Sequence, residues 1–314
     1  MHDPISRRQA LGVFAAPLIA GIAGCRTDSL LSPSLGSAAV GEGFTLIGAG
    51  DPQPSQATTW HLRSRHETAR MIRAVLDADP TAMAFNAGDL VQNGTAAEYR
   101  DCYHPTWGGF LDRTYCTMGN HDRMTNRGAE YYAYTGAEPY YARDLGAHWR
   151  LYVLNTESVS AGGADAAVQA EWMRQDIAAH PGKHRLLMCH YPLFSNVCAT
   201  NQKAMVLPGK VGPWWQILQR NGGELVISGH AHRYERMAKA LRDGTRSSEG
   251  MRQFVVGTGG IKTMGVLSRH PLYETATVAI GVVRYDLFPD RYQWTFTDTA
   301  GAIRDSGTQM CRNV

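Results

Sequence analysis

The sequence has no run of lysine or arginine and no excess of one charge. It contains 31 Lys and Arg residues against 28 Asp and Glu residues, so the net charge of the 314 residues is only +3. Proteins that follow a nucleic-acid backbone carry clustered positive charge, and we therefore expect no specific nucleic-acid partner. Hydrophobic residues make up 44% of the chain, enough for one large α/β core or two modest domains. A single domain is the simpler expectation.

Cysteine is scarce and never spaced as Cys-x-x-Cys, so a structural zinc site is not expected. Besides Cys25, the sequence contains Cys102, Cys116, Cys189, Cys198 and Cys311. In an exported protein, an odd number of cysteines leaves at least one thiol unpaired. Cys189 and Cys198 flank His190 and are one candidate pair, but spacing alone does not choose among the possible partners.

The N-terminal apolar run, from Leu11 to Gly24, is too short to span a bilayer comfortably. It follows Ser6-Arg7-Arg8-Gln9-Ala10-Leu11, which resembles a twin-arginine export signal. It leads into Ile22-Ala23-Gly24-Cys25, which resembles a bacterial lipobox. Residues 1–24 are therefore predicted to be a signal peptide that is removed, with Cys25 lipidated at the new N-terminus. The alternative is an ordinary signal peptide cut nearby, with Cys25 unmodified.

Residues 26–43 are rich in Ser, Gly, Ala and Leu and show no sustained period, which is typical of a flexible tether. The predicted organisation is a signal peptide over 1–24, a lipidated cysteine and tether over 25–43, and a folded domain over 44–314. We expect export by the twin-arginine route and a periplasmic or cell-surface lipoprotein that is held to a membrane by its lipid.

Five short polar clusters each follow an apolar run that predicts a strand. The runs are 44–49, 82–87, 115–118, 185–189 and 225–228. The clusters are Asp51-Pro52-Gln53, Gly88-Asp89, Gly119-Asn120-His121-Asp122, His190-Tyr191-Pro192 and Gly229-His230-Ala231-His232. In sheets with helical crossovers, polar groups at the carboxyl ends of several strands converge on one crevice, where ligands bind. Carboxylates, imidazoles and amide oxygens bind divalent metals, so together the clusters predict a metal site.

Helical spacing predicts helices over 62–76, 166–179 and 214–218. In the middle one we expect a buried face made of Val168, Trp172, Met173 and Ile177. The tail from Ala276 to Gly307 alternates apolar and polar residues around a turn at 288–291. It predicts a hairpin that closes a second sheet.

The order of the clusters, D-x-(H/Q), GDxxxxG, GNH(D/E), HxP and GHxH, resembles that of the calcineurin-like metallophosphoesterases, from about Phe44 to the C-terminus. The resemblance implies an α/β fold of two packed mixed β-sheets flanked by helices, a four-layer αββα sandwich. It makes residues 44–314 the catalytic domain. Segments 229–236 and 253–260 are similar to those of purple acid phosphatases, and Tyr103–Gly108 is similar to a segment of secreted bacterial phosphoesterases of this superfamily.

The resemblance also implies a pair of metal ions, Fe, Mn or Zn, bridged by Asp89. The other ligands of one metal would be Asp51 and His232. The other ligands of the second metal would be Asn120, His190 and His230, with Asn120 binding through its amide oxygen.

Two positions depart from the family pattern. Gln53 stands where many members have histidine, and an amide oxygen is a weaker donor than imidazole for such metals. Gln92 stands where purple acid phosphatases have a tyrosine ligand, so a purple charge-transfer colour is not expected.

The implied mechanism is in-line attack on phosphorus by a water or hydroxide that the metals hold. His121 would contact the phosphoryl group or protonate the leaving oxygen, with Asp122 orienting its ring. Asn120 would also contact the substrate, and Arg233 and Tyr234 are candidate contacts of the leaving group, as is the segment 195–203. Taken alone, each Asp, Asn or His has a structural interpretation as a turn, cap or core residue, and only the constellation favours a site.

The predicted function is hydrolysis of a small phosphate monoester. The alternatives are a phosphodiesterase or nucleotidase with the same metals, and a metal-poor binding lipoprotein in which Gln53 has weakened the first site. The sequence leaves open the physiological substrate, the metal and the oligomeric state.

Overall fold

A computed structural model describes residues 43–53, 59–160, 165–196, 206, 208–263, 265 and 270–314. The chain divides into two units, residues 1–36 and 37–314, and every described residue belongs to the second. The predicted signal peptide, Cys25 and the tether up to residue 42 lie outside the described residues, as do Cys198 and residues 197–203 of the candidate substrate segment.

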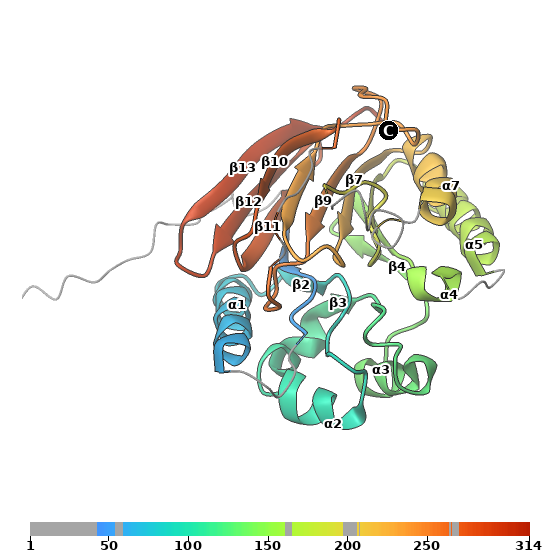
Figure 1. Cartoon of the computed structure of the whole chain (residues 1–314). Coiled ribbons are helices and arrows are strands. Elements are labelled where there is room, and N and C mark those ends of the chain that lie inside the picture. The colour runs from blue at the N-terminus through green and yellow to red at the C-terminus, as the bar shows by residue number, and fades with distance from the viewer. Residues whose placement is uncertain are drawn as a thin grey trace, which may run out of the picture. The chain divides into compact units, whose positions relative to one another are not determined.

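The described strands form two mixed sheets (Figure 1). The first sheet has the order β13-β12-β11-β1-β2-β3, in which β1 pairs in parallel with β2 and antiparallel with β11. Its strands are β1 (Phe44–Ala49), β2 (Met83–Asn86), β3 (Thr114–Cys116), β11 (Gly281–Leu287), β12 (Arg291–Asp298) and β13 (Ile303–Met310). The three strands that precede predicted ligands here are β1, β2 and β3. They are parallel, so their carboxyl ends meet at one edge.

The second sheet has the order β10-β8-β9-β7-β6-β5-β4. Its strands are β4 (Tyr141–Leu145), β5 (Trp149–Val153), β6 (His184–Met188), β7 (Gly223–Ser228), β8 (Tyr234–Met237), β9 (Arg252–Val256) and β10 (Tyr273–Thr277). The neighbours β6 and β7 are parallel, and they deliver the other two predicted clusters.

Helices cover the outer face of each sheet (Figure 1). The α-helices are α1 (Thr59–Ala78), α2 (Ala96–Glu98), α3 (Ala129–Thr135), α4 (Thr156–Ser160), α5 (Asp165–Ala179) and α7 (Pro208–Gln219). A π-helical turn, η1 (Tyr99–Tyr103), and two 3₁₀ segments, η2 (Trp107–Arg113) and η3 (Asn126–Gly128), complete the set of described helical segments.

Three apolar clusters fill the spaces between these layers. The first joins the facing sides of the two sheets, for example Phe85 and Tyr285 with Phe254. The second packs α5 and α7 on the second sheet, and the third packs α1 on the first. Burial of such apolar surfaces is the main stabilising term in folding. The predicted four-layer arrangement of helix, sheet, sheet and helix is confirmed.

Two local predictions need correction. The tail hairpin is present as β11 and β12, but β11 pairs with β1 and so extends the first sheet. It does so because alternation in β11 turns Val283 and Tyr285 into the core between the sheets. Val168 was expected on the buried face of α5, yet it is 52% exposed. Gln169 faces inward instead, and its amide hydrogen-bonds Asn155.

The described cysteines Cys102, Cys116, Cys189 and Cys311 are all free. The Sγ of Cys189 lies 3.4 Å from the carbonyl oxygen of Tyr191, a hydrogen bond inside its own segment. A membrane-spanning helix is likewise absent from the part of the chain that the structure describes.

Candidate metal centre at the strand ends

The five predicted clusters meet where the two sheets come together at the carboxyl ends of β1, β2, β3, β6 and β7. Asp51, Asp89 and His230 all have a left-handed backbone, with φ of 58°, 56° and 67°. Such a backbone is unfavourable for residues other than glycine and is often found at functional sites. Glycines allow the main chain of neighbouring clusters to approach these two carboxylates closely. A Cβ at Gly119 would collide with Asp89, and a Cβ at Gly229 would collide with Asp51.

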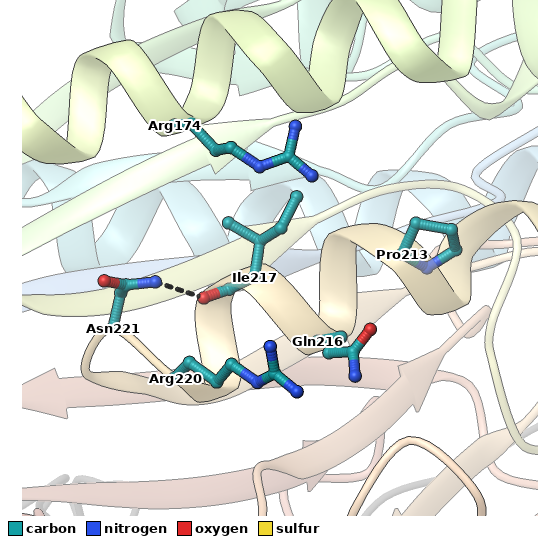
Figure 2. Close-up of a pocket in the computed structure, with 6 residues that line it drawn as sticks. All are labelled: Arg174, Pro213, Gln216, Ile217, Arg220 and Asn221. Atoms are coloured by element: carbon teal, nitrogen blue, oxygen red, sulfur yellow. Dashed lines mark hydrogen bonds between the residues drawn. The ribbon is translucent and has the colours of Figure 1, made fainter.

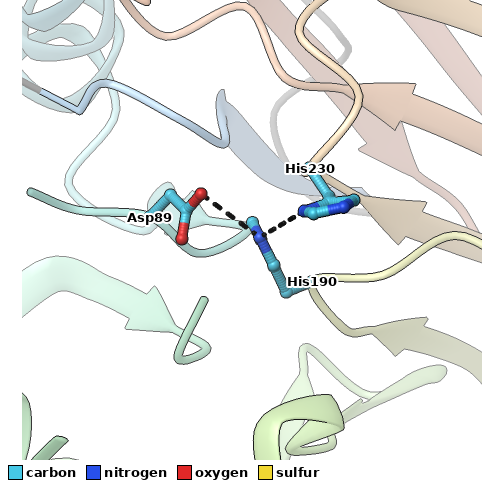
Figure 3. Close-up of side chains that lie close together, drawn as sticks. All are labelled: Asp89, His190 and His230. Atoms are coloured by element: carbon cyan, nitrogen blue, oxygen red, sulfur yellow. Dashed lines mark hydrogen bonds and ion pairs between the residues drawn. The ribbon is translucent and has the colours of Figure 1, made fainter. Parts of the chain in front are cut away.

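Asp89, His190 and His230 form one group whose ligand atoms all lie within 4.8 Å of one another (Figure 3). Nε2 of His190 is 3.4 Å from Oδ2 of Asp89 and 3.2 Å from Nδ1 of His230. The amide oxygen of Asn120 is also 3.2 Å from Nε2 of His190. The predicted ligands of one metal are therefore gathered around the same imidazole nitrogen.

Asp51, Asp89 and His232 form a second group within the same 4.8 Å limit. Nε2 of His232 lies 3.6 Å from Oδ1 of Asp51. Asp89 belongs to both groups, as expected for a carboxylate that bridges two metals.

Main-chain groups orient the imidazoles. Nδ1 of His190 lies 2.8 Å from the carbonyl oxygen of Ala87, and His232 hydrogen-bonds the main chain at Lys262. A histidine that donates one ring N–H to a carbonyl presents its other nitrogen to a metal. The nitrogen that faces a carboxylate is Nε2 in both residues: it faces Asp89 in His190 and Asp51 in His232.

The charges of the cluster suit a cation. Asp51 and Asp89 are 0% and 1% exposed, and Oδ2 of Asp89 accepts no hydrogen bond from the residues that the structure describes. Burial raises the pKa of Asp51 well above its usual value. Burial also acts to raise the pKa of Asp89, but the positive charge of His190 and its neighbours holds it at about 2. Burial acts to lower the pKa of His190, yet Asp89 raises it to about 10.

The buried carboxylates thus favour positive charge at this point. Metal ions would supply the same positive charge through carboxylate and imidazole donors, which suit Fe, Mn and Zn. The residues present therefore fit a metal centre.

Gln53 is also consistent with this fit. Its side chain is buried, and neither its amide oxygen nor its amide nitrogen has a hydrogen-bond partner among the described residues. A buried amide without a partner is costly, by about 1–3 kcal/mol. Its main-chain N–H donates to the carbonyl oxygen of Asp89 at 3.2 Å, so Gln53 lies beside the cluster.

His121 is partly exposed, and its main-chain N–H donates to Oδ1 of Asp89 at 2.9 Å. The sequence predicted that Asp122 orients the ring of His121, and this prediction is wrong. Nδ1 of the ring lies 2.7 Å from the carbonyl oxygen of Gln92 instead. Asp122 is buried and accepts hydrogen bonds from the N–H groups of Leu90 and Gly119. It therefore ties the loop after β2 to the loop after β3.

The predicted substrate contacts Arg233 and Tyr234 are both buried and already have partners. Arg233 pairs with Glu235 at 3.1 Å. The hydroxyl of Tyr234 donates to Asp305 at 2.6 Å, and its ring stacks on Phe296 between the sheets. β8 begins at Tyr234, and the alternation of a strand turns this ring into the core. Both residues are therefore corrected from substrate contacts to structural ones.

Sequence reasoning missed two features of the site. The segment after β9 lies against the Asp51 loop, with Gly259 N–H bonded to Gly50 and Ile261 N–H bonded to Asp51. The glycines of Gly257-Thr258-Gly259-Gly260 were the available signal. The second feature is the ring of Tyr191, which lies 3.9 Å from that of His230 between centroids.

A separate pocket of about 240 Å³ lies between α5 and α7 (Figure 2). It is lined by Arg174, Pro213, Gln216, Ile217, Arg220 and Asn221. None of these residues belongs to the predicted site.

A family model described as calcineurin-like phosphoesterase matches residues 45–234. None of the curated proteins compared with the sequence matches it. Among solved structures, purple acid phosphatase PPD1 from yellow lupin (Lupinus luteus) seeds superposes with a TM-score of 0.63 at 15% identity, over 85% of this chain and 53% of that one. GAP50, the anchor in the inner membrane complex of Plasmodium, superposes with a TM-score of 0.66 at 11% identity, over 87% of this chain and 90% of that one.

PhoD gives a TM-score of 0.58 at 11% identity, over 86% of this chain and 68% of that one. This chain spans about half the length of the lupin phosphatase. At these identities the likeness establishes the fold alone.

Proposed function

The chain belongs to the calcineurin-like phosphoesterase family, and on that basis we propose that it is a dinuclear metal-dependent phosphomonoesterase. The observation that carries the proposal is that two ligand groups share Asp89. One adds His190 and His230, and the other adds Asp51 and His232. A bridging carboxylate is the ligand that two ions roughly 3.5–4 Å apart require.

Asn120 would complete the group of His190 with its amide oxygen, which already lies 3.2 Å from Nε2 of that residue. Gln53 would complete the group of Asp51, because its buried amide has no hydrogen-bond partner in the part of the chain that the structure describes. When bound, the two ions would neutralise charge on the phosphoryl oxygens and activate the attacking water. We favour Mn or Fe, which a chain exported in the folded state would acquire in the cytoplasm. Zinc in both positions of natively exported protein would contradict this preference.

His121 is the proposed proton donor to the leaving oxygen. The carbonyl oxygen of Gln92 engages Nδ1, so Nε2 is free to meet the substrate. General acid catalysis by a positioned histidine contributes typically about 10²–10⁴-fold to a rate. Asp122 would position the loop after β3, because its carboxylate accepts a hydrogen bond from the N–H of Gly119, which precedes Asn120.

The substrate is proposed to be a small phosphate monoester, and the protein an exported lipoprotein of the secreted bacterial branch with Cys25 lipidated. Residues 1–24 would be its signal peptide, 25–43 its tether and 44–314 its catalytic domain. The same metals also serve phosphodiesterases and nucleotidases, so substrate class is decided by experiment.

The test is metal content and turnover of the purified mature protein with p-nitrophenyl phosphate and bis-p-nitrophenyl phosphate, beside His121→Ala. We expect about two metals per chain, faster monoester hydrolysis, and loss of turnover without loss of metal in the variant. Faster diester hydrolysis would favour the phosphodiesterase. No activity after reconstitution with Mn, Fe or Zn would favour a binding lipoprotein.

A further inference from the structure

A buried ion pair directly follows the metal-ligand motif. Arg233 and Glu235 are 1% and 0% exposed, with Nε and Oε1 3.1 Å apart. A buried ion pair is weak grounds for stability, because desolvation of the charges offsets their attraction. The contacts that the pair makes with other segments are therefore more informative than the pair itself.

Glu235 holds the end of the segment that begins at His190. Its carboxylate accepts hydrogen bonds from the Ser195 hydroxyl at 3.3 Å and from the Asn196 N–H at 3.1 Å. Gln253 on β9 supports the same segment, because its amide oxygen accepts the N–H of Leu193 at 2.9 Å. Residues 190–196 therefore run from a ligand of the metal centre to a fixed buried anchor.

Arg233 holds a second segment. Its Nη1 donates to the carbonyl oxygen of Gly265 at 2.7 Å. At its other end, this segment is bonded to the metal centre, through Ile261 N–H to the carbonyl oxygen of Asp51 and through the Lys262 main chain to the ring of His232. The described residues 257–263 are thus bonded to the metal centre, and Gly265 is bonded to Arg233.

The first segment is also bonded to His270, where the described chain resumes after Gly265. The side-chain oxygen of Asn196 accepts the N–H of His270 at 2.6 Å, and the rings of Phe194 and His270 lie 5.4 Å apart. The 190–196 segment carries Tyr191, which packs on His230 and is partly exposed. The leaving group of a phosphate ester bound at the metal centre would meet residues that border the ligands in this way.

We propose that Arg233 and Glu235 form an anchor pair that positions the segment 190–196 and Gly265, next to the described residues 257–263, and thereby sets the selectivity for the leaving group. The selectivity part rests on the proposed phosphoesterase function. Arg233 and Glu235 are positioning residues in this account, because neither has an exposed atom with which to touch a substrate.

The chain offers a matched control in Lys239 and Glu224. Glu224 on β7 is also fully buried, and it pairs with Lys239 at 3.3 Å. It too accepts a main-chain N–H from another segment, that of Arg312 at 2.9 Å. Both carboxylates thus have a basic partner and a main-chain N–H, and Glu224 also pairs with Nε of Arg312 at 2.8 Å. Glu224 holds the C-terminal tail and not a segment of the site.

The test compares the double variants Arg233→Met/Glu235→Gln and Lys239→Met/Glu224→Gln with the full mature chain. Each double variant removes both charges of its pair, so that neither partner is left as a buried unpaired charge. In the control variant Arg312, which is partly exposed, also loses a carboxylate partner but keeps its hydrogen bonds to the carbonyl oxygens of Gln219 and Glu249. The measurements are metal content, the kcat/KM ratio of bis-p-nitrophenyl phosphate to p-nitrophenyl phosphate, and amide hydrogen exchange.

In the anchor variant we expect faster exchange at Asn196 and His270, unchanged metal content, and a ratio changed about tenfold, since small displacements near reacting groups have large effects on rate. The control variant should change none of these. Unchanged exchange and ratio in the anchor variant, or loss of metal, would overturn the proposal. If the wild type hydrolyses neither ester, the proposed function and the selectivity claim both fail, while hydrogen exchange still decides whether the pair positions the segments.

Discussion

Oδ2 of Asp89 lies 3.4 Å from Nε2 of His190, and both side chains are buried. The two residues come from different sheets, Asp89 from the loop after β2 and His190 from the loop after β6. Across the described ranges of the chain, the same oxygen accepts no hydrogen bond. The junction of the two sheets therefore carries an unsatisfied carboxylate oxygen beside an imidazole, and it is around this pair that the candidate ligands gather.

Substitution of the shared carboxylate should have a larger effect than substitution of an unshared one. Asp89→Asn removes a ligand from both groups, whereas Asp51→Asn removes one from a single group. We expect metal analysis to find both metals lost or weakened in Asp89→Asn and about one retained in Asp51→Asn. Asp286→Asn is the control, because this carboxylate binds Arg284 in the first sheet. Equal losses in the two site variants would argue against a bridging role.

His121→Ala should lower kcat by about 10²–10⁴-fold, the usual range for a lost general acid. Metal content should stay the same, since the ring of His121 is bonded to Gln92 and belongs to neither ligand group. His104→Ala removes a histidine whose hydrogen bond is to Tyr134, and it should leave kcat unchanged. Loss of metal from the His121 variant would show that its role is in the ligand cluster.

The corrected role of Tyr234 gives a separate prediction. Tyr234→Phe removes the hydrogen bond to Asp305 while leaving the stacked ring, so unfolding in urea should show a loss of roughly 1 kcal/mol. KM should not change, because the side chain is fully buried. A raised KM with unchanged stability would restore Tyr234 as a substrate contact.

Arg150 and Asp176 should make stability depend on pH at the acidic end. The Arg150 guanidinium forms two hydrogen bonds with Asp176, and Tyr152 donates a third. Burial acts to raise the pKa of Asp176, but these partners lower it below its usual value of 3.8 in the folded state. The carboxylate thus stabilises the fold above about pH 4, and this stabilisation is lost as the pH falls through the folded-state pKa.

Urea unfolding of wild type and Asp176→Asn should therefore differ by about 1.5–3 kcal/mol at pH 7, the usual contribution of hydrogen bonds to charged groups. The difference should shrink as the pH is lowered below 4. A difference that stays constant over this range would show that Asp176 contributes through packing alone.

Lipidation is tested at Cys25, which lies outside the described residues. We expect wild-type protein to fractionate with membranes after export, and Cys25→Ser to be released as soluble exported protein. The same fractionation of both proteins would support the alternative of an ordinary signal peptide.

The sequence was sufficient to predict the strands that carry the ligands. Runs such as 44–49 and 225–228 are apolar on both faces, as expected for strands with a sheet or helices on either side, and the structure has strands at these positions. The ligand groups could also be predicted, because residues such as Asp51 and His230 follow strand ends whose convergence is a property of the fold.

The orientation of the supporting side chains was not predictable in the same way. Arg233 and Tyr234 are polar residues next to a ligand motif. Tyr234 is buried where β8 pairs with β9, and Arg233 is buried beside its ion-pair partner Glu235. The ring of His121 was assigned to its neighbour Asp122, but adjacent residues diverge, and a main-chain carbonyl 29 positions earlier in the chain holds the ring instead. Such partners leave no trace in spacing, because any residue supplies a carbonyl.

The central claim is that two metal ions share Asp89, and anomalous diffraction from crystals of the metal-loaded protein tests it most directly. We predict two anomalous peaks roughly 3.5–4 Å apart, with one carboxylate oxygen of Asp89 directed at each. A single peak, or two peaks that Asp89 does not join, would contradict the claim.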